Sequence, residues 1–129
     1  MTRFLILLSI YWQSAMHGVD PRIVTAMVYV ESSFRSNAVN RGCIGLMQVS
    51  LATWKLKLQL DESRMTEVMY NLDKGLDILQ IYYRQTGDIW KALHFYNNGP
   101  SGKYNNTNYV RKVKRVYKLI QGRASCHTW

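Results

Sequence analysis

The sequence predicts a mainly α-helical fold in one domain, with at most a small hairpin or irregular region around residues 35–45. Apolar residues recur at helical spacing in most segments, and no run of convincing strand length appears. The chain has 129 residues, about the length of one domain. Its 47% hydrophobic and 19% charged residues are typical of a chain that folds around a core, which excludes disorder. We therefore expect residues 1–129 to form a single domain.

The N-terminal segment contains an apolar run at residues 4–12 (FLILLSIYW). This run is far shorter than the roughly 20 residues of a transmembrane helix, so no transmembrane segment is expected. It fits a buried first helix, capped by Thr2 and ended near Gly18. It also fits the apolar part of a signal peptide, with Arg3 before it. We favour the buried helix.

Capping residues and glycine stops predict the remaining elements. Asp20 and Pro21 begin a helix that runs to about Ser33. The region 35–45 is rich in Ser, Asn and Gly and predicts a loop or short hairpin. Further helices are predicted after Ser50 to 58 and over 71–86, 88–96 and 109–121, with loops at 61–63 and 97–108.

The charge distribution is strongly asymmetric. The chain has 17 Lys and Arg against 8 Asp and Glu, and every acidic residue precedes residue 89. On the last predicted helix, one face carries Arg111, Lys112, Lys114, Arg115 and Lys118. Nucleic acid, anionic lipid and bacterial cell wall would all suit such a face, and a simply solvated face is the plain alternative. Charge alone does not choose between them.

Glu31 is the residue that the pattern singles out. It continues the apolar stripe of Val24, Met27 and Val28, where a carboxylate loses hydration and its pKa should rise unless a cation pairs with it. It is either a structural glutamate bonded to the backbone or a general acid that holds its proton near neutral pH. Gly42 and Gly45 would let a backbone segment approach this acid closely and leave an open groove beside it.

Three motifs follow one another with compatible spacing: ESSF at 31–34, GCIGLMQ at 42–48 and FYNNGP at 95–100. In this the chain resembles the soluble lytic transglycosylases, relatives of goose-type lysozyme, whose patterns read E-S-x-F, G-x-x-G-L-M-Q and A-Y-N-x-G. The segments at 18–21, 71–75 and 109–110 are similar to further conserved pieces of that family. The resemblance spans about residues 11–117.

The resemblance implies a lysozyme-like α+β fold and cleavage of the MurNAc–GlcNAc β-1,4 bond of peptidoglycan with formation of 1,6-anhydro-MurNAc. It implies Glu31 as the sole general acid and base, assisted by the N-acetyl group of the substrate, an exception to the usual pair of carboxylates. It assigns substrate-binding positions to Ser32, Met47, Gln48, Tyr96 and Asn97. For Met47, packing in the core is the favoured interpretation.

Some positions depart from the family pattern. Val49 and the residues after it stand where the family often has a proline, and Phe95 replaces a usual alanine, so we expect an altered loop and a bulkier groove wall. His94 is expected to pack rather than to catalyse. The chain has no CxxC or Cys/His cluster, so neither a metal nor a cofactor is expected. Cys43 and Cys126 are either free thiols or a disulfide formed after export.

Two other functions stay open at this point. One is a hydrolase of the goose-type lysozyme kind, in which water replaces the C6 hydroxyl as nucleophile. The other is a basic non-enzymatic module that binds glycan or nucleic acid. For the enzyme we expect peptidoglycan glycan strands as partner, no specific nucleic acid, a monomer, and action on the bacterial cell wall in the periplasm. A bacteriophage lysis or virion enzyme is the expected setting, with an exported bacterial protein as the alternative.

Overall fold

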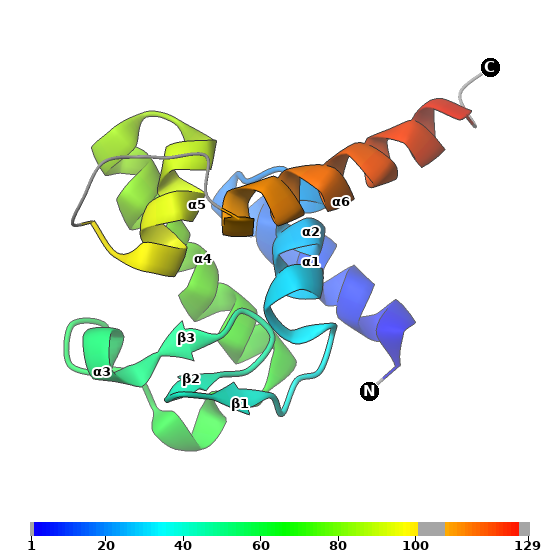
Figure 1. Cartoon of the computed structure of the whole chain (residues 1–129). Coiled ribbons are helices and arrows are strands. Elements are labelled where there is room, and N and C mark those ends of the chain that lie inside the picture. The colour runs from blue at the N-terminus through cyan, green and yellow to red at the C-terminus, as the bar shows by residue number, and fades with distance from the viewer. Residues whose placement is uncertain (1, 101–107, 127–129) are drawn as a thin grey trace.

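A computed structural model describes residues 2–100 and 108–126 of the chain. The helices are α1 (Arg3–His17), α2 (Pro21–Ser32), α3 (Leu51–Trp54), α4 (Val68–Thr86), α5 (Ile89–Asn98) and α6 (Asn108–Cys126), with a short 3-10 turn, η1 (Glu62–Arg64). Three short antiparallel strands, β1 (Val39–Asn40), β2 (Cys43–Ile44) and β3 (Val49–Ser50), lie in the order β1-β2-β3. The predicted mainly helical α+β fold is thus confirmed (Figure 1).

Local signals in the sequence account for most helix ends. The side chain of Thr2 accepts a hydrogen bond from the first turn of α1, and Gly18 ends that helix in the left-handed conformation. Asp20 caps α2 in the same way, with Pro21 at the first helical position. Asp88 caps α5 directly after α4 has ended at Gly87. These boundaries confirm the predicted ones because each depends only on neighbouring residues.

The first helix differs from its prediction in burial. One face of α1 packs on α2 and α4, and there Ile6 and Ile10 are buried. Other large apolar side chains of the same helix are exposed, among them Trp12 at 61% and Met16 at 66%. The expectation of a buried first helix is therefore wrong for one face, because α1 has neighbours on only one side. Among the described helices, none combines the length and the apolar character that crossing a bilayer requires.

The region between α2 and α4 contains more strand and less helix than predicted. The hairpin expected at 35–45 is present, but β3 adds a third strand directly after Gln48. Ser50 caps the next helix as predicted, but α3 ends at Trp54 rather than at Leu58. The buried side chain of Trp54 anchors this short helix. Leu56 is 91% exposed, so no burial of an apolar side chain at that position stabilises a further helical turn.

The core is organised around α4. Its residues Leu72, Leu76 and Leu79 are fully buried, and the helix contacts α1, α5 and β3. Four residues beyond Leu79, Tyr83 is exposed, and Tyr82 is buried instead. Figure 1 shows the small sheet and α3 on one side of α4, with α2 and α6 on the other. Residues 101–107, in the predicted loop 97–108, lie outside the described residues, and Asn97 and Asn98 belong to α5.

Asn71 ties the loop between β2 and β3 to α4. Its side chain is almost fully buried, accepts a hydrogen bond from the backbone of Met47 at 2.9 Å, and donates to the carbonyls of Ile44 and Met65, both at 2.8 Å. Gly45 leaves room for this amide, since a Cβ at that position would collide with the Asn71 side chain and lie 2.6 Å from the Met65 carbonyl. The loop that carries Gln48 is therefore held by a side chain of the central helix.

We expect Asn71→Ala to lower the free energy of unfolding by about 3 kcal/mol or more, because three buried backbone groups lose their partner. Urea denaturation followed by circular dichroism measures this. The exposed Asn37 supplies a matched control, and Asn37→Ala should change stability by less than about 0.5 kcal/mol. Equal effects of the two substitutions would contradict this role of Asn71.

Candidate active site

A cavity of about 590 Å³ opens between the small sheet and the helices. Its wall combines Glu31 from the end of α2, Cys43 and Gln48 from the sheet region, and Tyr96 and Asn97 from α5. Residues more than 60 positions apart in the sequence thus meet around one space large enough for parts of a carbohydrate chain.

Glu31 is the acidic group of this cavity, and its acidity is strongly altered. Burial raises the pKa of its carboxyl from the usual 4.5 to about 7, and a contact with the hydroxyl of Tyr109 lowers the pKa by a smaller amount. Glu31 is also the second-last residue of α2, where the helix dipole disfavours a negative charge. Within the described residues no Lys, Arg or His forms an ion pair with it. Such a carboxyl holds its proton near neutral pH, as a general acid must.

Tyr109 of α6 is a site residue that the sequence matched to a conserved segment of the family without assigning it a role. Its ring is 9% exposed, and its buried hydroxyl forms no well-aligned hydrogen bond with a described residue. Burial, and then the nearby Glu31, raise the pKa of Tyr109 well above its usual value, so the phenol stays neutral. This hydroxyl therefore has Glu31 as its polar neighbour, a contact that helix periodicity alone cannot reveal.

We expect Tyr109→Phe to raise the pKa of Glu31 further, because the hydroxyl that favours the ionised carboxyl is lost. The alkaline limb of the kcat/KM profile should move to higher pH, with kcat/KM at pH 6 within about tenfold of wild type. The exposed Tyr29 on the same helix as Glu31 provides the control, and Tyr29→Phe should leave the profile in place. If the pH profile of Tyr109→Phe is the same as that of wild type, the hydroxyl of Tyr109 does not influence the pKa of Glu31.

Tyr96 connects α5 to the loop before β3. Its hydroxyl donates a hydrogen bond to the carbonyl of Met47 at 2.7 Å. Burial, with Glu31 as a further cause, raises the pKa of this phenol well above its usual value. Tyr96 thus acts as a neutral donor that fixes one wall of the cavity, while the neighbouring Asn97 is exposed on the cavity surface.

Gln48 lines the cavity in a strained conformation. Its φ of 49° lies in the left-handed region, which is uncommon for a residue other than glycine. Its side-chain amide donates to the carbonyls of Ala38 at 3.1 Å and Gly45 at 3.0 Å. Strain of this kind is concentrated at functional sites, and here it directs the amide into the loop beside the cavity.

Two of the proposed substrate-binding residues do not line this cavity. The hydroxyl of Ser32 is buried and donates to the Val28 carbonyl at 3.1 Å within α2. Met47 is fully buried against Gly75 of α4, where an added Cβ would lie 2.5 Å from the methionine sulfur. Packing in the core is thus where the structure places Met47.

The predicted role of the two glycines needs correction. Gly42 has open space around it, and Gly45 makes its close approach to Asn71 rather than to Glu31. The groove beside the acid arises instead from the separation of the sheet and the helices. Glycine spacing could not show this, because the partner of a close approach is decided by the tertiary fold.

Aromatic side chains form a wall that the sequence identified only at Tyr96 and Phe95. Trp54, Tyr82 and Phe95 line the cavity, and their rings meet edge to face with centroids 5.8 and 5.9 Å apart. His94 is buried beside Phe95 and lies 3.3 Å from the amide of Asn98, which supports its expected packing role.

Cys43 is half-buried on the cavity wall, and burial, followed by the nearby Glu31, raises the pKa of its thiol. The thiol is therefore not activated as a nucleophile. Its predicted alternatives, a free thiol or a disulfide with Cys126, depend on a side chain that lies outside the described residues.

Glu31 is the only acidic residue on the cavity wall. All eight Asp and Glu residues fall within the part of the chain that the structure describes, so this statement covers all of the acidic side chains. Ordinary glycosidases place a second carboxyl about 5–9.5 Å from the acid. The three described side chains that could together hold a metal ion, His17, Asp73 and Asp77, also lie outside this wall. The chemistry available here is that of a single carboxyl.

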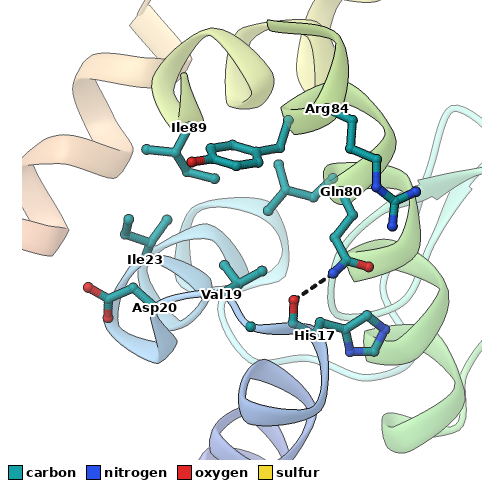
Figure 2. A pocket seen from close by; sticks show the side chains of 10 residues that line it. His17, Val19, Asp20, Ile23, Gln80, Arg84 and Ile89 are labelled. Atoms are coloured by element: carbon teal, nitrogen blue, oxygen red, sulfur yellow. Dashed lines mark hydrogen bonds between the residues drawn. The ribbon is translucent and has the colours of Figure 1, made fainter. Parts of the chain in front are cut away.

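A second cavity, of about 350 Å³, lies where the turn between α1 and α2 meets α4 (Figure 2). Asp20 lines this cavity. Burial raises the pKa of its carboxyl, but the hydrogen bonds that Arg22 donates to it have the larger combined effect, so the pKa lies below its usual value. A carboxylate that is ionised and paired in this way cannot donate a proton at neutral pH. The cavity around Glu31 is therefore the candidate active site.

Comparison with known proteins gives matches over most of the chain. A family model described as "Transglycosylase SLT domain" matches residues 9–118. Two curated proteins of Escherichia coli, both named "X polypeptide", are similar to the chain. One is 27% identical over 118 residues, covering 82% of this chain and 68% of the relative. The other is 28% identical over 120 residues, covering 81% of this chain and 69% of the relative. No solved structure matches significantly.

Proposed function

The chain belongs to the transglycosylase SLT family, and we propose that it is a lytic transglycosylase that cleaves the MurNAc–GlcNAc β-1,4 bond of peptidoglycan and forms 1,6-anhydro-MurNAc. One observation carries the proposal: a lone carboxyl with its pKa raised to about 7 lies in a cavity whose wall has no second acid. A single group near neutrality suits a reaction in which the same carboxyl first gives and then takes a proton.

In the first step Glu31 donates its proton to the glycosidic oxygen, and the bond from this oxygen to C1 of MurNAc breaks. The positive charge that develops at C1 is stabilised by the N-acetyl oxygen of the same sugar, which replaces the missing second carboxylate. The buried setting of Glu31 keeps the acid protonated until the substrate arrives.

In the second step the C6 hydroxyl of MurNAc attacks C1, and the ionised Glu31 takes the proton of this hydroxyl. The carboxyl returns to its protonated state, and no water enters the product. Since burial also makes the ionised form of Glu31 a stronger base, the same environment favours both proton transfers.

The other residues of the site either contact the substrate or hold the site in position. We assign Gln48 and Asn97 to substrate contact, since both line the cavity. The amide of Asn97 can bond the N-acetyl group, whereas Gln48 has its side-chain oxygen left to accept a hydrogen bond because its NH₂ group donates within the loop. Tyr96 is a positioning residue through its bond to the Met47 carbonyl. Ser32 and Met47 support the site from within the core.

The reaction class is tested by mass spectrometry of the muropeptides that the enzyme releases from purified sacculi. A transglycosylase releases products that end in anhydro-MurNAc and lack the mass of one water. Products with a full reducing end would identify a hydrolase of the goose-type lysozyme kind. Release of no fragments at all, with sacculus binding unaffected by Glu31→Gln, would support a non-enzymatic binding module.

The basic face of α6 is proposed to hold the enzyme on the anionic wall. Lys112, Arg115 and Lys118 are exposed, whereas Lys114 lies over the ring of Trp90 at 5.2 Å and is partly withdrawn. Changing the three exposed residues to Gln should weaken sacculus binding at low salt by roughly tenfold while turnover of short soluble fragments is unchanged. Co-sedimentation measures the binding. The same three-charge change at Lys55, Arg84 and Lys91 is the control, and equal losses from both sets would show a non-specific charge effect.

The family membership places the action of this protein on the cell wall. Within that, we propose a monomeric single catalytic domain that is delivered to the periplasm, as a phage lysis or virion enzyme or as an exported bacterial protein. Comparison of the intact mass of the protein from periplasm and from cytoplasm separates these settings, because export through a signal peptide removes residues near the N-terminus.

A further inference from the structure

A cluster of three side chains joins the end of α1 to α4, outside the cavity of Glu31. The imidazole of His17, the last residue of α1, places its Nε2 atom 3.1 Å from Oδ1 of Asp73 and 3.1 Å from Oδ1 of Asp77. The two aspartates lie four residues apart and therefore on one face of α4. All three ligand atoms fall within 4.8 Å of one another.

The second ring nitrogen of His17 is already committed. Nδ1 lies 2.7 Å from the backbone carbonyl of Gln13, which can only accept, so Nδ1 carries the proton. In the neutral imidazole Nε2 then presents a lone pair toward two carboxylate oxygens. This histidine side chain is only 9% exposed, so little water is available to separate these groups. With Nδ1 carrying the ring proton, the three facing atoms, Nε2 and the two carboxylate oxygens, are all electron-pair donors of the kind that coordinate a cation.

From this geometry we infer that His17, Asp73 and Asp77 form a binding site for a divalent transition-metal ion of the zinc type. Metal-bound histidines regularly donate their other ring N–H to a backbone carbonyl, as His17 does to Gln13. Separations of 3.1 Å lie between the octahedral and tetrahedral edges, about 3.0 and 3.4 Å, of a coordination shell with metal–ligand bonds of about 2.1 Å. One imidazole nitrogen with two carboxylate oxygens suits zinc better than Mg²⁺ or Ca²⁺, which prefer oxygen ligands only.

The surroundings leave this site accessible to an ion. The side chains of Asp73 and Asp77 are 39% and 38% exposed, so water can complete the coordination shell. The nearest ammonium group, that of Lys74, lies 3.7 Å from the other oxygen of Asp73, Oδ2, and leaves Oδ1 directed at the imidazole. The cluster also differs from an ordinary surface pair, because two carboxylates four residues apart on a helix repel one another unless a cation is shared.

The site would act as a clamp between two helices. The backbone carbonyl of His17 accepts a hydrogen bond from Gln80 of α4 at 2.5 Å, and Figure 2 shows this bond together with the imidazole turned toward α4. Gln13 makes a further contact by donating to the carbonyl of Met69 at 3.2 Å. A metal ion bound by His17 of α1 and by Asp73 and Asp77 of α4 would link the two helices and stabilise the packing of α1, which is exposed on its other face.

The test is thermal unfolding of the full chain, first freed of metal with a chelator and then titrated with Zn²⁺. At a free concentration of 100 times its Kd, Zn²⁺ should raise the Tm of wild type by roughly 5–10 °C. The shift between metal-free and metal-loaded protein should vanish in Asp77→Asn, Asp73→Asn and His17→Gln. It should persist in Glu62→Gln, which removes an exposed carboxylate paired with Lys55 elsewhere on the surface. Because each variant is compared with its own metal-free state, altered basal stability does not obscure the result.

Binding of Co²⁺ followed by absorption identifies the ligands directly. Nitrogen and oxygen ligands give weak visible bands that disappear in Asp77→Asn. A strong sulfur-to-cobalt charge-transfer band would mark a cysteine site instead and overturn the assignment. The absence of a Zn²⁺-induced shift in wild type, or an equal shift in wild type and Asp77→Asn, would also overturn it.

Discussion

Replacing Glu31 by Gln should lower kcat for release of muropeptides from sacculi by at least about 10³-fold, because the amide can neither give nor take the proton. The side chains are nearly isosteric, so the cavity and its aromatic wall should persist. Reverse-phase separation with mass detection of the released fragments measures the loss. Sacculus binding should stay within about twofold of wild type, since the basic face of α6 is untouched.

The matched control for this substitution is Glu62→Gln. Glu62 is exposed on η1 and pairs with Lys55, so its replacement makes the same chemical change outside the cavity. It should leave kcat unchanged. Retention of more than a tenth of wild-type turnover in Glu31→Gln would remove Glu31 from the chemistry and, with it, the proposed mechanism.

The second large effect is a dependence of activity on pH. Since burial raises the pKa of Glu31 to about 7, the acid form prevails below this pH and is lost above it. On a short soluble substrate, kcat/KM should be level below about pH 7 and fall tenfold for each unit above it, or about 100-fold by pH 9. A short substrate is needed because the charge of whole sacculi also changes with pH. An alkaline limb near pH 5 would mean that the carboxyl is solvated.

The same titration should appear in stability, which, like activity, is lost as the pH rises. The pKa of Glu31 is about 7 in the folded chain against a usual 4.5, so the folded state binds more protons between these values. The free energy of unfolding should therefore fall as pH rises through this window, by about 3 kcal/mol in all, and stay level above pH 7. Urea denaturation of wild type and Glu31→Gln, compared at each pH, isolates this contribution. Glu31→Gln should be the more stable protein at pH 8.

These two effects describe one compromise. If the carboxyl of Glu31 were solvated, the folded chain would be more stable at neutral pH, but the carboxyl would be ionised and could not donate a proton. The buried carboxyl retains its proton, and the folded chain is less stable for it. Tyr109 moderates the balance, because its hydroxyl is the polar group that the structure places beside Glu31. A loss of stability at the site, together with a pKa raised toward neutral pH, is a recurring feature of catalytic carboxyls that act as general acids.

The sequence by itself determined the starts of α1, α2 and α5 and the candidate acid. Thr2, Asp20 and Asp88 cap helices through contacts with residues two or three positions away, so no tertiary information was needed. Glu31 was recognisable because it stands on an apolar stripe, and helical periodicity predicts which neighbours it has in its own helix. The motifs around Gln48 and Tyr96 were likewise visible as local patterns.

Only the tertiary structure decided which residues surround the acid and what the remaining polar groups do. Tyr109, Trp54 and Tyr82 reach the cavity or Glu31 from other helices, and Ser32 turns into the core although it is the next residue after the acid. His17 gained partners 56 and 60 positions away, which no spacing rule connects to it. Burial, the pKa of a carboxyl and the ligands around a cation depend on distances between segments, and those distances exist only once the helices have packed.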